Sequence, residues 1–125
     1  MQLAVAAAVL AFLAPGDRAA ATYAGGALAL TLHYEMTCGE PGPGPLVVEV
    51  PAAFRLKDVA VAGRHSSVRG HTVTIAIPGP TGVTCMSIAE GTLRVRLTGV
   101  HAPPGSYTVK AQIHRHAFAT RLRIS

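Results

Sequence analysis

Histidine is the residue type in this chain best suited to hold a metal ion. The 125 residues include six histidines, of which His114 and His116 are closest in sequence. On a β-strand, residues two positions apart share a face with Cα atoms roughly 6.6 Å apart, so two imidazoles there are near enough to share a metal. Histidine and thioether ligands outside the cytoplasm favour copper. A third ligand would come from one of four residues: His33, Met36, Met86 or His101.

The alternative for this pair is a structural one. His114 and His116 flank Arg115, and all three fit the polar tip of a hairpin, where solvated residues are expected. No other residues in the sequence have the spacing of a known metal or cofactor motif. We therefore expect no resident cofactor, and keep His114 and His116 as the only metal candidates.

Two pairs of arginines form the second candidate site. Eleven Lys and Arg stand against six Asp and Glu, which gives a formal net charge of +5. Arg94 and Arg96 share one face of a predicted strand, and Arg121 and Arg123 share one face of another. Together they predict a cationic stripe whose partner is an anionic cell-wall polymer, a phospholipid head group, a polysaccharide or another surface protein. The alternative is ordinary solvated faces that keep an edge strand from aggregating.

The motifs of the common enzyme classes are missing from the sequence. Its acidic residues are isolated, so a hydrolase with paired carboxylates has little to work with. The chain has no G-x-S-x-G elbow, no H-E-x-x-H and no phosphate-binding glycine loop. A triad assembled from distant strands stays open, with Ser66, Ser67, Ser87 or Ser106 as its nucleophile. We therefore expect the protein not to be an enzyme. Only three Tyr and three Phe are available to stack on bases, so we also expect no nucleic acid partner.

Cys38 and Cys85 are the two cysteines of the chain. Outside the cytoplasm a lone pair of thiols in one small domain normally oxidises, so we expect one structural disulfide. A bridge between Cys38 and Cys85 would close a loop of nearly fifty residues. In the chain-entropy model, closing such a loop stabilises the fold by roughly 4 kcal/mol. The alternative, a catalytic or redox pair, lacks the C-x-x-C spacing of redox enzymes.

The first 21 residues are typical of a secretory signal peptide. Leu3 to Ala14 is an uninterrupted run of twelve apolar residues, too short to cross a bilayer, and a Pro-Gly pair follows it. Ala19 and Ala21 supply the small residues that a signal peptidase requires three and one positions before its cut. We predict cleavage before Thr22, one mature domain over residues 22–125 without a membrane span, and an extracellular or periplasmic location. The alternative is a buried helix of the fold or a short anchor.

Beyond this segment the apolar residues recur at every second position, which is the period of a β-strand. Turns rich in Pro and Gly separate the runs and leave no room for a crossover helix. The sequence therefore predicts an all-β domain, an antiparallel β-sandwich of about seven strands. The predicted runs are residues 28–36, 46–50, 59–61, 68–77, 93–98, 106–113 and 118–124.

Several of these runs resemble the immunoglobulin-like modules of bacterial secreted and surface proteins. In those modules a strand ending in P-A-x-F precedes a V-x-V-x-G turn, and a G-V-x-x-P-P-G-x-Y-T-V corner leads into the last hairpin. The resemblance implies an immunoglobulin-like sandwich that is a secreted, non-enzymatic binding, structural or adhesion domain. The segments that carry it are Leu46–Phe54, Val59–Gly63, His71–Ile75, Gly91–Val100 and Pro103–Val109.

The last hairpin also resembles that of the copper-resistance periplasmic sandwich, in which a G-x-Y-T-V strand precedes a turn that bears histidine. This second resemblance implies an alternative function, an extracytoplasmic copper-binding domain with His114 and His116 as ligands. That family's amino-terminal histidine ligand, just after the signal cut, has no counterpart in residues 22–24.

Overall fold

A computed structural model of the chain describes residues 17–36, 44–77, 89–114 and 116–125, with only the backbone described at 35, 36, 89 and 90. These ranges contain strands and turns and no helix, so no helix within them could span a membrane. The strands are β1 (Arg18–Ala24), β2 (Ala27–Met36), β3 (Gly44–Glu49), β4 (Arg55–Val61), β5 (Ser66–Arg69), β6 (Thr72–Ile77), β7 (Ala89–His101), β8 (Gly105–Ile113) and β9 (His116–Ile124).

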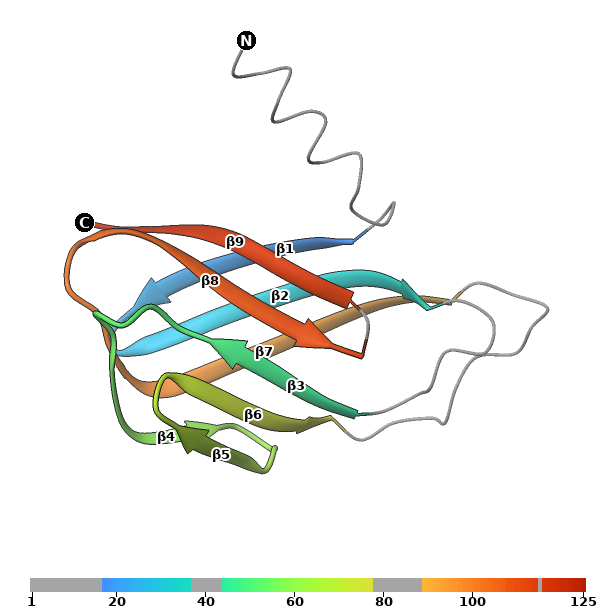
Figure 1. Cartoon of the computed structure of the whole chain (residues 1–125), viewed down its shortest axis with the longest axis horizontal. Helices are drawn as coiled ribbons and strands as arrows, with labels where there is room; N and C mark the ends of the chain where they lie inside the picture. The colour runs from blue at the N-terminus through green and yellow to red at the C-terminus, as the bar shows by residue number, and fades with distance from the viewer. Residues whose placement is uncertain (1–16, 37–43, 78–88, 115) are drawn as a thin grey trace, which may run out of the picture.

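These strands form two antiparallel sheets that lie face to face (Figure 1). Sheet A has the order β1-β2-β7-β4, and sheet B has the order β5-β6-β3-β8-β9. Each sheet buries one face against the other and leaves its second face to solvent. The predicted antiparallel β-sandwich is therefore confirmed.

The core consists of the inward-facing residues of both sheets. In β2, Leu28, Leu30 and Leu32 are at most 1% exposed, and in β6 of the opposite sheet Val73 and Ile75 are fully buried. Burial of one such side chain contributes about 1.5–3 kcal/mol. The burial of the apolar side chains that recur at every second position thus holds the two sheets together.

β2 and β7 are the central strands of sheet A and form its longest ladder. Ten Cα pairs join them, from Ala27 opposite Thr98 to Met36 opposite Ala89. The residues of β7 that alternate with the buried ones face solvent, and they include Arg94 and Arg96. This ladder therefore fixes which side chains of sheet A are available to a ligand.

β1 lies where the sequence predicts the end of a signal peptide. It pairs with β2 along its whole length, from Arg18 opposite His33 onward. Every second residue of β1 is half-buried, and Ala19 and Ala21 pack against the core. Cleavage before Thr22 would remove most of this strand, so the predicted boundary falls inside an element of the fold.

The other differences from the predicted strands concern β4, β5 and β6. β4 begins at Arg55, several residues before the predicted run, and the single predicted run over residues 68–77 is divided into two strands by a turn at Gly70. β5 is one of the two edge strands of sheet B, and all four of its residues are exposed. Its sequence has no apolar alternation, because neither of its faces is buried.

A bulge in β4 is held open by a glycine of β7. Leu56 pairs with Val100 and Ala60 with Thr98, so three residues of β4 stand opposite Gly99 alone. Gly99 has a φ of +78°, and a Cβ there would overlap the carbonyl oxygen of Lys57 and lie 2.8 Å from that of Asp58. Only glycine fits both the left-handed backbone and this close approach.

Replacing Gly99 with alanine should therefore destabilise the protein more than the same change at a roomy left-handed glycine. Gly63 is the matched control, since its φ is +72° and a Cβ there meets nothing within 4 Å. We expect Gly63→Ala to lower the free energy of unfolding by about 1 kcal/mol, the cost of the left-handed backbone. Gly99→Ala should cost roughly 1–3 kcal/mol more, because of the overlap. Equal losses in urea unfolding would contradict this account of the bulge.

The contribution of β1 can be measured by comparing two chains, one beginning at Asp17 and one at Thr22. The longer chain keeps the packing of Ala19 and Ala21 and the contact of Asp17 with buried His116. We expect the shorter chain to be less stable by roughly 2 kcal/mol or more, since it loses apolar burial and a buried polar contact. Identical unfolding midpoints would show that residues 17–21 are dispensable, as the predicted cleavage site requires.

Candidate functional site

The two predicted arginine pairs lie on opposite layers of the sandwich. Arg94 and Arg96 are exposed on β7 of sheet A, and Arg121 and Arg123 are exposed on β9 of sheet B. Each pair is on the outer face of its sheet, because its neighbours in the strand are buried or half-buried. The single stripe expected from the sequence is therefore wrong, and the arginines form two separate surfaces.

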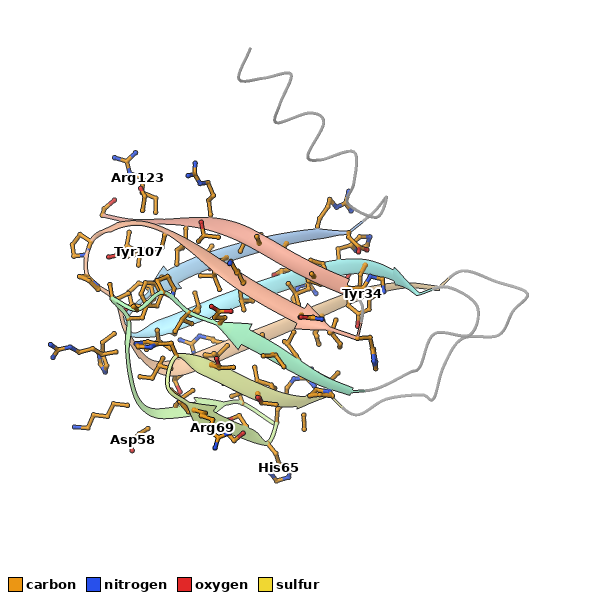
Figure 2. The ribbon with its side chains drawn as sticks, in the orientation of Figure 1. Tyr34, Asp58, His65, Arg69, Tyr107 and Arg123 are labelled. Atoms are coloured by element: carbon orange, nitrogen blue, oxygen red, sulfur yellow. The ribbon has the colours of Figure 1, made fainter. Side chains whose placement is uncertain are left out.

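The surface on sheet B contains a shallow hollow. Thr108 stands opposite Arg121 and Ser106 opposite Arg123 in the β8–β9 ladder. The hollow between them has a volume of about 460 Å³, and none of the six residues that line it is acidic. Lys110 is exposed one step further along β8, on the same face. We call Lys110, Arg121 and Arg123 the β9 face, and Figure 2 shows Arg123 at its outer end.

On sheet A the row of the ladder that contains Arg94 runs on to two glutamate positions. Arg94 stands opposite Thr31 in the β2–β7 ladder, and the row continues to Glu35 opposite Glu90. His33 lies between, with its Nδ1 3.0 Å from the hydroxyl oxygen of Thr92. A ligand that followed this row would leave the arginines and reach two acidic positions.

Basic side chains greatly outnumber carboxylates among the described residues. Ten of the eleven Lys and Arg side chains are described, and every one except half-buried Arg64 is exposed. The described carboxylates are Asp17, Glu49 and Asp58. In this part of the chain the ion pair that the structure records joins Asp17 to a histidine, and no Lys or Arg takes part in one. The cationic groups are thus available to an outside anion.

The structure brings together a third basic cluster that sequence reasoning missed. Arg55, Lys57, His71 and His101 line one hollow of about 730 Å³. They come from the start of β4, the turn before β6 and the end of β7, which meet at one end of the sandwich (Figure 1). We call these four residues the basic pole. Because they come from three distant segments, no spacing in the sequence marks them.

Two tyrosines fix the β7–β8 turn that follows His101. The hydroxyl of Tyr107 contacts the carbonyl oxygens of Pro103 and Pro104, at 2.8 and 3.2 Å. The hydroxyl of Tyr23 donates to the carbonyl of Val100 at 2.9 Å and accepts from the amide of Ala102 at 3.2 Å. Between them lies buried Phe54, whose ring centroid is 4.9 Å from that of Tyr107. The pole is therefore built on a rigid turn, and Figure 2 shows Tyr107 at this end and Tyr34 at the other.

The two candidate metal ligands do not share a strand face. Ile113 pairs with His116, so residues 114 and 115 connect β8 to β9, and His114 has a φ of +52°. The His114 ring packs against Gly44, where a Cβ would come within 2.6 Å of its Cε1. His116 is buried, with Nδ1 2.9 Å from an Asp17 carboxylate oxygen and its ring 5.1 Å from that of Tyr34. The side-by-side geometry expected from the spacing is thus absent.

Other histidines and acids do not complete a metal site within the described ranges. No group of three or more His, Cys, Asp or Glu side chains comes together there. Cys38 and Cys85, like Met86 and Ser87, lie outside the described residues. The expected disulfide therefore stays a prediction.

No protein-family model matches this chain, and no curated protein matches it at a significant level. The candidate sites consequently rest on the residues and their geometry.

Removing the Tyr107 hydroxyl tests whether it stabilises the turn between β7 and β8. Tyr107→Phe keeps the ring contact with Phe54 but loses the contacts with the carbonyls of Pro103 and Pro104. We expect the free energy of unfolding to fall by about 1 kcal/mol, the usual net value of a hydrogen bond. Tyr107→Ala should cost roughly 3 kcal/mol, because the ring is lost as well. A phenylalanine variant as stable as the original protein would show that the hydroxyl does not hold the turn.

Proposed function

We propose that this protein is a secreted, non-enzymatic immunoglobulin-like domain that binds an anionic cell-surface polymer through its β9 face. One observation carries the proposal: Arg121 and Arg123 line a hollow of about 460 Å³ that no acidic residue lines. Lys110 is exposed on the same face, with Glu49 of β3 opposite it. The hydroxyl groups of Ser106 and Thr108 stand opposite the arginines and can donate to the same anion. The arginine guanidinium matches the planar oxygens of carboxylate and phosphate groups.

A polymer suits this face better than a single small anion. An exposed cation and an anion attract each other by only about 0.2–1 kcal/mol. Three such contacts, repeated along a chain of charges, add up to a useful affinity and make binding sensitive to salt. The partner that fits is therefore a polymer with carboxylate or phosphate groups outside the cell.

The immunoglobulin-like type of sandwich is supported by the corner between β7 and β8. In immunoglobulin domains a tyrosine at the start of the corresponding strand bonds back to the main chain a few residues upstream. Tyr107 stands three residues into β8 and contacts the carbonyls of Pro103 and Pro104 in the same manner. The neighbours β1, β2 and β7 in one sheet and β3, β8 and β9 in the other also fit that topology.

Secretion and a disulfide complete the proposal. The segments that carry Cys38 and Cys85 are attached to the described ends of β2 and β7, at Met36 and Ala89. Met36 and Ala89 are Cα partners in the sheet, so the two segments join the sandwich at one point. This proximity of the attachment points supports a bridge in an oxidising compartment.

The β9 face can be separated from general charge attraction by two double variants. Arg121→Ser/Arg123→Ser and Arg94→Ser/Arg96→Ser remove the same charge from opposite sheets. On a polyanion column we expect the β9 variant to elute at a clearly lower salt concentration than the original protein, and the β7 variant to shift much less. Equal shifts would mean that net charge alone causes retention, which would contradict a site on β9.

Peptide mapping without reductant tests the disulfide. Cys38 should be recovered joined to Cys85 from secreted protein, and Cys38→Ser/Cys85→Ser should lower the free energy of unfolding by up to about 4 kcal/mol. The far-ultraviolet circular dichroism of this variant should remain that of a β protein, since the core does not depend on the bridge. Free labelling of both thiols in the native secreted protein would overturn the expectation.

A further inference from the structure

The basic pole is a concave surface, and two of its side chains come from adjoining strands. Arg55 and His101 are Cα partners in the β4–β7 ladder, and both are exposed. Partners of this kind in an antiparallel sheet lie about 4.5–5.5 Å apart at Cα. Their side chains can therefore reach the same anionic group.

The β4 bulge shapes this surface. Lys57 belongs to the bulge opposite Gly99, and a bulge changes the direction of the side chains it carries. Lys57 and Arg55 line the same hollow of about 730 Å³, and His71 lines it from the turn before β6. Buried Phe54 contributes to the floor of the hollow and packs between the two tyrosines of the pole. The four side chains of the pole are thus mounted on a packed base.

A second hollow continues the surface beyond Arg55 and His101. It has a volume of about 470 Å³, shares those two residues with the first hollow and is also lined by Tyr23. A single ion would occupy one hollow. Two hollows that meet at Arg55 and His101 suit an elongated ligand with several negative groups.

The basic side chains around the pole favour such a ligand, and two carboxylates nearby oppose it. Asp17 contacts His116, and neither it nor Glu49 lines either hollow, but Glu49 is exposed at the end of β3, opposite Thr72 and thus close to His71. Asp58 follows Lys57 in the bulge, is exposed and has a φ of +51°. Figure 2 shows it beside β4. Its removal should strengthen binding here.

We propose that the basic pole is a binding site for a linear polyanion, with Arg55 and His101 holding one oxyanion group where the two hollows meet and Lys57 and His71 holding the next. This inference rests on the proposed function for the class of ligand, but it places the ligand across the end of the sandwich. The shared chemistry is a chain of oxyanion groups, which phosphates or carboxylates can supply.

The test measures affinity for two soluble polymers, inorganic polyphosphate and polyglutamate, at low salt with the full chain. We expect Arg55→Gln/His101→Gln to weaken binding roughly two- to fivefold, as one exposed charge contact and the imidazole beside it are lost. Asp58→Asn should strengthen it roughly two- to fourfold, and asparagine tolerates the left-handed backbone at that position. Preference for one polymer identifies phosphate or carboxylate as the group that the pole recognises.

The outcomes separate the pole from the β9 face. Unchanged affinity in both Arg55→Gln/His101→Gln and Asp58→Asn, with a loss in Arg121→Ser/Arg123→Ser, would overturn the pole and leave the proposed function standing. Weaker binding in Arg55→Gln/His101→Gln and stronger binding in Asp58→Asn, with unchanged affinity in Arg121→Ser/Arg123→Ser, would support the pole and overturn the β9 face. If neither polymer binds the original protein, both proposals fail. Circular dichroism and urea unfolding confirm that each variant is folded, which exposed positions should permit.

Discussion

The register between β2 and β7 is the constraint on which the rest of the sandwich depends. These are the central strands of sheet A, and a slip of one residue would turn Leu28, Leu30 and Leu32 toward solvent. The burial of those leucines therefore fixes the ladder. The same register directs Arg94 outward and places Gly99 where β4 must bulge. The surfaces at both layers and at the pole follow from one pattern of apolar contacts.

The elements that could be predicted from the sequence are those whose two faces differ in polarity. In β7, leucine and valine alternate with arginine, and the strand is evident from the sequence alone. β1 alternates in burial just as regularly, but it does so with alanine on both faces, so no period is visible. The same small residues, Ala19 and Ala21, satisfy a peptidase motif. The same short segment is thus compatible with a cleavage site and with a strand, and only its packing against the core reveals the strand.

Residues within one strand could be related by sequence, whereas residues on different strands could not. The period of two placed Arg121 and Arg123 together, but it gave no way to know that Arg94 lies on the opposite layer. The two-residue period of a strand did not apply to His114 and His116. His114 lies in the connection between β8 and β9, whereas His116 is the first residue of β9. The basic pole depends on three chain segments that converge through turns, and local pattern contains no information about such convergence.

The exposed edge strand β5 of sheet B has a consequence for self-association. A free strand edge is a template on which another copy can add, and half of this chain is apolar. β5 offers only four residues for such pairing, ends at Arg69 and is preceded by Arg64 and His65. Two copies that approached through β5 would bring like charges together along a very short ladder. This edge of sheet B therefore discourages growth of the sheet from one molecule into the next through β5.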